Sequence, residues 1–121
     1  MIEEQDVIIE EYEDYIIAYL NGTISIKNIK DVDTVLNRAL DNKPEILGIN
    51  CKYLTHIDSI TINHLLKLSK KALDLNVKLV IFNLSSAIES VVNTINLNRL
   101  VTITTKEIFE DEYLSKKIDE R

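Results

Sequence analysis

The sequence predicts an α/β domain with a mixed β-sheet of four or five strands and helices packed mainly on one side. Two runs rich in β-branched and aromatic residues, 6–12 and 15–20, flank Glu13-Asp14 and predict an N-terminal hairpin. Beyond the hairpin, short apolar runs alternate with segments whose apolar residues recur every three or four positions. A hairpin followed by alternating strands and helices is typical of an α/β fold with a mixed sheet.

The length and composition predict one soluble domain over residues 1–121, with its core in roughly residues 5–110 and a charged tail at 115–121. No apolar run reaches the roughly 20 residues that span a membrane, and the acidic N-terminus lacks the basic start of a signal peptide. The single cysteine, Cys51, cannot form an internal disulfide. We therefore expect a cytoplasmic protein without membrane association.

The charge of the chain indicates the class of its partners. A net charge of -6 argues against nucleic-acid binding and favours protein partners. The acidic N-terminal residues ordinarily form a solvated face, and the alternative is that they steer a basic partner. These residues are Glu3, Glu4, Glu10, Glu11, Glu13 and Asp14.

The first helix is expected after Asn21-Gly22, a pair that predicts a turn ending the second strand. Asn28 is a suitable cap, and Pro44 disfavours helical geometry at the residue before it. The apolar positions with helical spacing are Ile29, Val32, Leu36, Ala39 and Leu40. Residues 46–51 then form a short apolar strand.

The second helix is expected to begin at Asp58-Ser59 and to end near Asn76, a residue type that tolerates the left-handed conformation of a helix terminus. Its predicted buried stripe is Ile62, Leu65, Leu66, Ser69 and Leu73. Residues 77–82 form the next strand.

Two capping boxes predict the remaining helices. Ser86 with Glu89 opens a helix, and Thr104 with Glu107 opens another, after a last strand at residues 100–103. The first of these helices is expected to bury Ile88, Val91, Val92 and Ile95, and the second to dock through Ile108 and Phe109. Because each apolar stripe needs a sheet to cover, we expect the helices that begin near Ser59 and Ser86 to lie on the same side.

Residues 56–66 are the stretch where chemistry is most concentrated, because an apolar strand gives way there to a helix. Asp58 and Ser59 both have the oxygen that accepts from an unpaired N–H of a first helical turn. A hydroxyl at that position is exposed, and the positive end of the helix dipole favours a phosphate. Taken alone, Asp58-Ser59 is most simply a helix cap.

Catalytic and metal-binding interpretations of the same stretch are weaker. A hydrolase triad of His56, Asp58 and Ser59 is unfavourable because sequence neighbours rarely converge in the required geometry, and no Gly-x-Ser-x-Gly elbow is present. His56 and His64 lack the helical spacing of metal ligands, and a chain with two glycines has no phosphate-binding glycine loop. Cys51 is expected to be a small buried apolar residue. We therefore expect no enzymatic activity, no cofactor and no metal.

The run from Gly48 to Ile62, GINCKYLTHIDSITI, resembles the signature of STAS domains of the bacterial anti-sigma factor antagonist type. The resemblance implies a STAS-like fold, in which Asn50 ends a strand, Asp58 is the acid of the signature and Ser59 is the phosphoacceptor of a partner kinase. Further segments resemble the same family, namely residues 21–24, 75–79 and 85–97. Ser25 stands where the family often has Asp, and Thr61 and Asn63 stand where the family usually has Gly.

The resemblance implies a regulatory protein similar to an anti-sigma factor antagonist. Such a protein binds an anti-sigma factor serine kinase and is switched off when Ser59 is phosphorylated. The alternative is a scaffold or accessory STAS subunit of a stressosome-like or transporter-associated assembly, in which Ser59 only caps a helix. A monomer or weak homodimer is expected. The expected partner-binding residues are Ser25, His56, Asp58, Ser59, Ile60, Thr61, Asn63 and His64.

Overall fold

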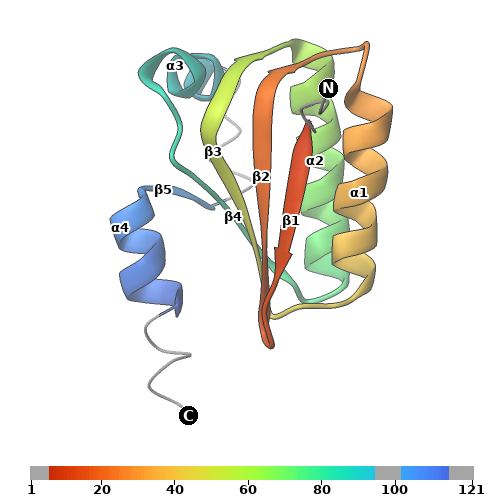
Figure 1. The fold of residues 1–121 in the computed structure, drawn as a ribbon, viewed down its shortest axis with the longest axis vertical. Coiled ribbons are helices and arrows are strands. Elements are labelled where there is room, and N and C mark those ends of the chain that lie inside the picture. Colours follow the sequence, from red (N-terminus) through yellow and green to blue (C-terminus); the bar gives the residue numbers. More distant parts are fainter. Residues whose placement is uncertain (1–5, 95–101, 115–121) are drawn as a thin grey trace, which may run out of the picture.

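A five-stranded mixed sheet with the order β1-β2-β3-β4-β5 forms the centre of the molecule (Figure 1). The computed structural model describes residues 6–94 and 102–114. Strand β1 (Val7–Glu11) pairs antiparallel with β2 (Tyr15–Ile24), as the predicted hairpin requires. The parallel strands that follow are β3 (Ile46–Ile57), β4 (Lys78–Phe82) and β5 (Thr102–Thr104). The predicted fold class is confirmed.

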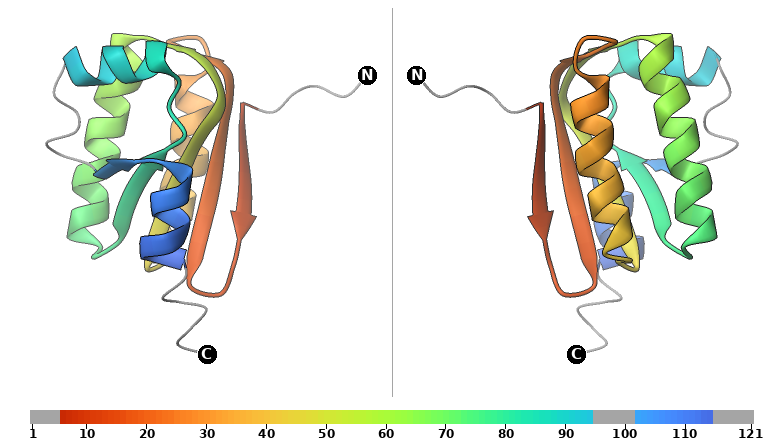
Figure 2. Two further views of the ribbon diagram at one scale, coloured as in Figure 1. Left: turned by 90° about the vertical axis from the view of Figure 1, so that its left-hand side faces the viewer. Right: turned by 90° about the vertical axis from the view of Figure 1, so that its right-hand side faces the viewer.

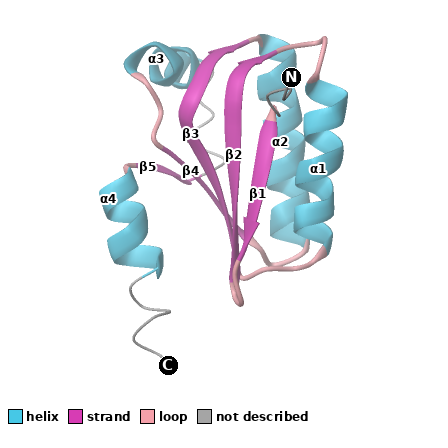
Figure 3. Ribbon diagram, in the orientation of Figure 1, coloured by secondary structure: helices cyan, strands magenta, loops and turns pink. Residues whose placement is uncertain are grey.

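Three helices contribute to one core cluster against the sheet, and a fourth packs in a separate cluster on the other face. Figures 2 and 3 show α1 and α2 side by side on one side of the sheet and α4 on the other. Helices α1 (Ile29–Asp41), α2 (Ser59–Asp74) and α3 (Ser86–Thr94) each connect two neighbouring parallel strands. Such crossovers share one handedness, so their helices fall on the same side when successive strands are added in one direction. The expected placement of the helices that begin near Ser59 and Ser86 is therefore confirmed.

Helix α4 (Lys106–Phe109) continues into a π-helical turn (Glu110–Leu114) and covers part of the opposite face. Its anchor is Phe109, which is 1% exposed and stacks on Phe82 with ring centroids 4.3 Å apart. Gly48 makes this approach possible, because a Cβ there would lie 2.8 Å from the Phe109 ring. The expected docking through Ile108 is wrong: this side chain is 44% exposed.

Strands β2 and β3 run further than the sequence predicts. We expected Asn21-Gly22 to end β2 in a turn and β3 to stop at Cys51, and both expectations are wrong. The two strands stay paired to Ile24 and Ile57, with shifts of register on either side of Asn21-Gly22. Gly22 has a φ of 70°, in the left-handed region that glycine adopts without steric cost. The pair therefore forms an irregularity inside a strand.

Helix α2 buries a stripe rotated slightly from the predicted one. The buried residues are Thr61, Ile62, Leu65, Leu68, Ser69 and Ala72. Leu66 is only partly buried, and the prediction for Leu73 is wrong, since this side chain is 71% exposed. Leu66 and Leu73 are seven residues apart on the same edge of the stripe, where the packing of the sheet ends. The helix terminates as predicted, with Asn76 in the left-handed conformation at a φ of 59°.

The hydroxyl caps of α3 and α4 are not the predicted ones. The hydroxyl oxygen of Ser85, not Ser86, accepts from the backbone N–H three residues on, at 3.3 Å. The corresponding oxygen before α4 belongs to Thr105, not Thr104, and accepts at 3.1 Å.

The predicted stripe of α3 is also only partly right. Helix α3 buries Ile88 and Val92, while Val91 is 41% exposed. Other predicted features, namely Glu3, Glu4, Ile95, the first part of the last strand and the charged tail, lie outside the described residues.

Candidate functional site

The start of α2 lies beside the loop that joins β2 to α1. Because β2 and β3 are parallel, their carboxyl ends meet at one edge of the sheet, at the top of Figure 1. Residues 25–28 leave β2 at this edge, and Asp58-Ser59 leaves β3. Sequence segments more than thirty residues apart are thereby brought into contact at the predicted site.

Asp58 joins these two segments. It is the N-cap of α2, and its Oδ1 accepts from the backbone N–H of Thr61 at 2.9 Å. Its Oδ2 accepts from the backbone N–H of Ile26 at 3.2 Å. One carboxylate therefore caps the helix and holds the neighbouring loop, so that the prediction of a capping Asp58 is confirmed.

Thr61 is buried, with 1% of its surface exposed, although we expected it on a partner-binding surface. Its Oγ1 lies 2.9 Å from the carbonyl oxygen of Ile24 and 2.8 Å from Oδ1 of Asp58. The hydroxyl has one proton, so it donates to one of these two acceptors at a time or shares the proton between them. The side chain is thus directed toward the end of β2 and away from solvent, which corrects the sequence-based placement.

The electrostatics of Asp58 follow from these contacts. The Thr61 N–H lowers the pKa of the Asp58 carboxyl below its usual value, and the Thr61 hydroxyl and the Ile26 N–H act in the same direction. A lowered pKa means that the hydrogen-bonded carboxylate stabilises the fold at neutral pH. This stabilisation is lost as the pH falls through the folded-state pKa and the carboxylate is protonated.

The loop before α1 is held by Ser25 and Asn28. The backbone N–H of Ser25 donates to Oδ1 of Asn28 at 2.8 Å, and Nδ2 of Asn28 donates to the carbonyl oxygen of Thr23 at 2.8 Å. The Asn28 side chain makes no cap hydrogen bond to α1, although we expected it to cap that helix. It fixes the loop instead, and the loop then supplies the Ile26 N–H to Asp58.

The remaining predicted residues form the outer surface of this site. Ser59 is exposed at the first position of the 16-residue helix α2, and His56 and Asn63 are exposed as well. Ile60 is 36% exposed. His64 is half-buried, and its Nδ1 lies 3.5 Å from Oδ1 of Asp33 on α1, which ties the two helices.

Sequence reasoning missed Ile26, which is 66% exposed. This apolar residue lies in the loop held by Asp58, and its backbone N–H donates to the residue that precedes Ser59. The available signal was an apolar residue between a strand and a helix that belongs to the stripe of neither. A single exposed apolar side chain is common on protein surfaces, so that Ile26 gains interest only from its place beside the Asp58 cap.

Two further residues of the signature have structural partners. Asn50 is 7% exposed, and its Oδ1 accepts from the N–H of Lys52 at 3.0 Å and from Nδ2 of Asn83 at 3.1 Å. It therefore ties β3 to the loop after β4. Cys51 is buried as predicted, and burial raises the pKa of its thiol to about 12, so that it remains protonated.

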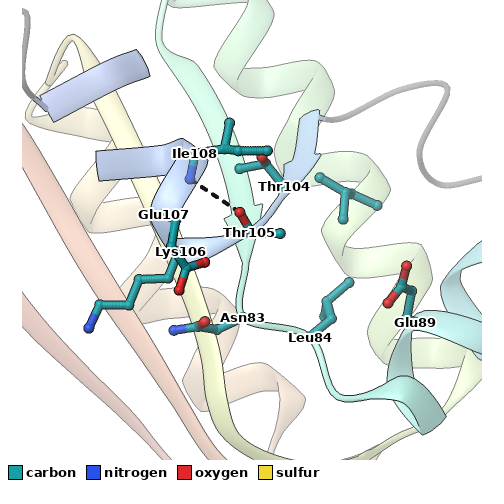
Figure 4. A pocket seen from close by; sticks show the side chains of 9 residues that line it. Asn83, Leu84, Glu89, Thr104, Thr105, Lys106, Glu107 and Ile108 are labelled. Carbon is teal, nitrogen blue, oxygen red and sulfur yellow. Dashed lines mark hydrogen bonds between the residues drawn. The ribbon is translucent and has the colours of Figure 1, made fainter. Parts of the chain in front are cut away.

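An open crevice of about 450 Å³, whose lining does not include Ser59, lies at the carboxyl ends of β4 and β5 (Figure 4). The loop after β4 leads to α3 and the loop after β5 leads to α4. Because these two helices pack on opposite faces of the sheet, the two loops move apart and leave the crevice between them. The lining residues are Asn83, Leu84, Glu89, Ile103, Thr104, Thr105, Lys106, Glu107 and Ile108.

No group of side chains suited to a metal ion occurs among residues 6–94 and 102–114. In the same part of the chain, no helix has the length and apolar character needed to cross a membrane.

Comparison with known structures identifies the same fold in several regulatory proteins. The unphosphorylated form of the anti-sigma factor antagonist SpoIIAA is similar with a TM-score of 0.75 and 14% identity, over 90% of this chain and 96% of SpoIIAA. The phosphorylated form of the Bacillus cell fate determinant SpoIIAA has a TM-score of 0.67 and 15% identity, over 88% and 97% of the two chains. RsbS of Moorella thermoacetica, carrying a serine-to-glutamate substitution, has a TM-score of 0.71 and 17% identity, over 84% and 88%.

At these identities the structural similarity concerns the fold alone. Comparison with curated protein sequences gives no match. The model of the STAS domain family matches residues 6–112, which include every described strand and the predicted site. The chain belongs to the STAS domain family.

Proposed function

We propose that this protein is a regulatory binding module similar to anti-sigma factor antagonists. It binds an anti-sigma factor serine kinase through the start of α2, and phosphorylation of Ser59 ends that binding. The observation that carries the proposal is the exposed Ser59 hydroxyl at the first position of α2, next to the Asp58 cap. SpoIIAA, which shares the fold, exists in unphosphorylated and phosphorylated forms.

The surroundings of Ser59 suit a kinase substrate. The side chain of Thr61 occupies the position of the family's usual glycine, but it is directed toward the Ile24 carbonyl and is buried. Its extra bulk therefore does not cover the Ser59 hydroxyl. The neighbouring exposed residues are Ile26, His56, Ile60 and Asn63.

The fold tolerates a phosphate at this position for a physical reason. A phosphate adds about 1.5 to 2 negative charges near neutral pH, and the N-terminal end of a helix favours negative charge. The Asp58 carboxylate next to it opposes this effect, but its two oxygens already accept from Thr61 and Ile26. Phosphorylation therefore changes the surface charge and leaves the domain folded.

Mass spectrometry of the protein tests the proposal. A pull-down identifies the bound kinase, and incubation with that kinase and ATP is expected to place one phosphate on Ser59. The Ser59→Ala variant is the control and is expected to remain unmodified. A bound kinase that leaves Ser59 unmodified would refute the phosphorylation switch.

A scaffold or accessory STAS subunit is the second candidate function. The observation that favours it is that both carboxylate oxygens of Asp58 accept hydrogen bonds within the domain. One caps α2 and the other holds the loop before α1. Asp58-Ser59 therefore has a sufficient role in folding without phosphorylation. In this case the pull-down recovers structural subunits in place of a kinase, and Ser59 is unmodified in every complex.

The partner surface is expected to centre on the exposed residues at the start of α2. Introducing a positive charge by Asn63→Lys is expected to weaken binding by roughly tenfold, because a chain of charge -6 favours a partner with basic groups at the interface. Titration calorimetry with the purified partner measures the change. The control Asp74→Asn raises the charge equally at the exposed far end of α2 and is expected to leave affinity unchanged. Equal losses for both variants would place the surface elsewhere.

A further inference from the structure

The face of the sheet opposite α1, α2 and α3 is covered only in part. Helix α4 lies over β3 and β4, where Phe109 packs on Phe82 and against Gly48. Within the described part of the chain, no helix continues this layer over β1 (Figure 2). On β2, Ile17 is buried in the cluster of Phe109, and Tyr15 and Tyr19 are only partly buried at its edge. The open surface therefore consists of β1 and these partly buried tyrosines of β2.

Tyrosines dominate this open surface. Strand alternation places the side chains of Ile8, Glu10 and Tyr12 on one face of the sheet. Ile8 is paired with Tyr19 on β2, so the Tyr19 side chain lies on this same face. Ile8 is 45% exposed and Tyr12 is 46% exposed. The rings of Tyr12 and Tyr15 stack with centroids 4.5 Å apart. We call this surface the tyrosine face, consisting of Ile8, Glu10, Tyr12, Tyr15 and Tyr19.

Glu10 lies at the centre of the tyrosine face. The Tyr12 hydroxyl donates to Oε2 of Glu10 at 2.8 Å, and the Tyr19 hydroxyl also donates to this carboxylate. The Tyr19 hydroxyl, followed by that of Tyr12, holds the pKa of Glu10 below its usual value. The carboxylate is therefore ionised and held by two tyrosine hydroxyls, next to the stacked rings of Tyr12 and Tyr15.

The charges around the tyrosine face are mainly negative. Glu11, Glu13 and Asp14 belong to the same hairpin. Among the described residues, Lys43 lines a polar hollow beside the face together with Glu11, Glu13 and Asp14. Lys106 borders the face but lies 3.9 Å from Glu110. Lys52 is positioned over the ring of Tyr53, 5.5 Å from its centroid. None of these three cations lies within ion-pair distance of the carboxylate of Glu10.

Tyr12 also separates two hollows of the surface. One, of about 170 Å³, is lined by Tyr15, Tyr19, Asn50 and Phe109 among others. The other, of about 300 Å³, is lined mainly by polar groups, including the acidic residues of the hairpin. A long cationic side chain would thus find both an aromatic wall and a nearby carboxylate.

We propose that the tyrosine face binds an arginine-bearing segment of a partner protein. A guanidinium is planar and weakly hydrated, so it stacks on tyrosine rings and pairs with a carboxylate at the same time, which an ammonium does less well. The turn of the hairpin at Glu13-Asp14, which is next to Tyr12 and Tyr15, and the start of α2 lie at opposite ends of the sheet (Figure 1). This interaction is therefore separate from binding at Ser59 and does not depend on the proposed function.

Fluorescence anisotropy with two short labelled peptides tests the proposal on the full chain. One peptide alternates arginine with glycine, and the other alternates lysine with glycine. The arginine peptide is expected to bind about threefold to tenfold more tightly, because stacking on the rings adds to the attraction between charges. Equal affinity of the two peptides would overturn the proposal.

Variants then locate the binding surface. Tyr12→Ala and Glu10→Gln are each expected to weaken binding of the arginine peptide by roughly threefold to tenfold. Ile8→Lys, at an exposed position, tests the same face without removing a ring or a hydrogen bond. The matched control for Glu10→Gln is Asp74→Asn, which removes one negative charge on α2. Thermal melting confirms that each variant is folded. If these variants lose no more affinity for the arginine peptide than Asp74→Asn does, the binding depends on net charge alone and the proposal is overturned.

Discussion

The Ser59→Asp variant is expected to bind the partner kinase at least roughly a hundredfold more weakly than the parent chain, while Ser59→Ala binds as tightly as the parent. Ser59 is exposed at the start of α2, within the proposed partner surface. A carboxylate introduced there must lose its hydration in the interface. It also meets repulsion if the kinase presents its catalytic carboxylate at this point, and like charges in contact cost several kcal/mol.

Stability measurements separate this effect from unfolding. Both variants are expected to melt within about a few degrees of the parent, because Ser59 makes no buried contact and a helix N-terminus favours negative charge. Calorimetric titration with the purified partner gives the affinities. Parent-like binding by Ser59→Asp, in a protein that is still folded, would contradict the switch and favour the scaffold function.

The Leu65→Ala variant is expected to lose roughly 2 to 5 kcal/mol of unfolding free energy. Leu65 is 6% exposed and belongs to the core between the sheet and the helices α1, α2 and α3. Truncation removes buried apolar surface and leaves a cavity that the close-packed interior fills only in part. Denaturation in urea, followed by circular dichroism, measures the loss.

Leu73→Ala is the matched control, because it makes the same substitution on the same helix. Leu73 is 71% exposed, so its truncation is expected to change stability by less than about 0.5 kcal/mol. The helical propensities of the two substitutions cancel in the comparison. Similar losses at both positions would show that the orientation of α2 on the sheet is wrong.

Much of this architecture is determined by local sequence patterns. The hairpin, predicted from its β-branched and aromatic runs, and the helical stripe of α1 are both found where they are predicted, and all five predicted apolar residues of α1 are buried. The start of α2 at Asp58-Ser59 could likewise be predicted from the sequence, because a capping carboxylate accepts from an N–H three residues along the same helix. Such features depend on neighbours in the chain, which the sequence contains explicitly.

The tertiary structure decided the features that depend on distant partners. Asn21-Gly22 is a turn signal, yet pairing with the long strand β3 keeps it inside β2. Thr61 is an ordinary polar residue in the sequence, and only contact with the Ile24 carbonyl makes it a buried one.

Contacts with distant elements also determine which apolar side chains at the edge of a stripe are buried and which are exposed. Leu73 continues the predicted stripe, but the core stops short of it. Phe109 and Ile108 are adjacent apolar residues, and the space above Gly48 selects Phe109 for the core. Ile26, which is 32 residues from Asp58 in the sequence, lies beside the cap of α2 because its N–H donates to the Asp58 carboxylate. Periodicity identifies which side of an element is apolar, but the extent of the packed surface is set by elements that meet it from elsewhere in the chain.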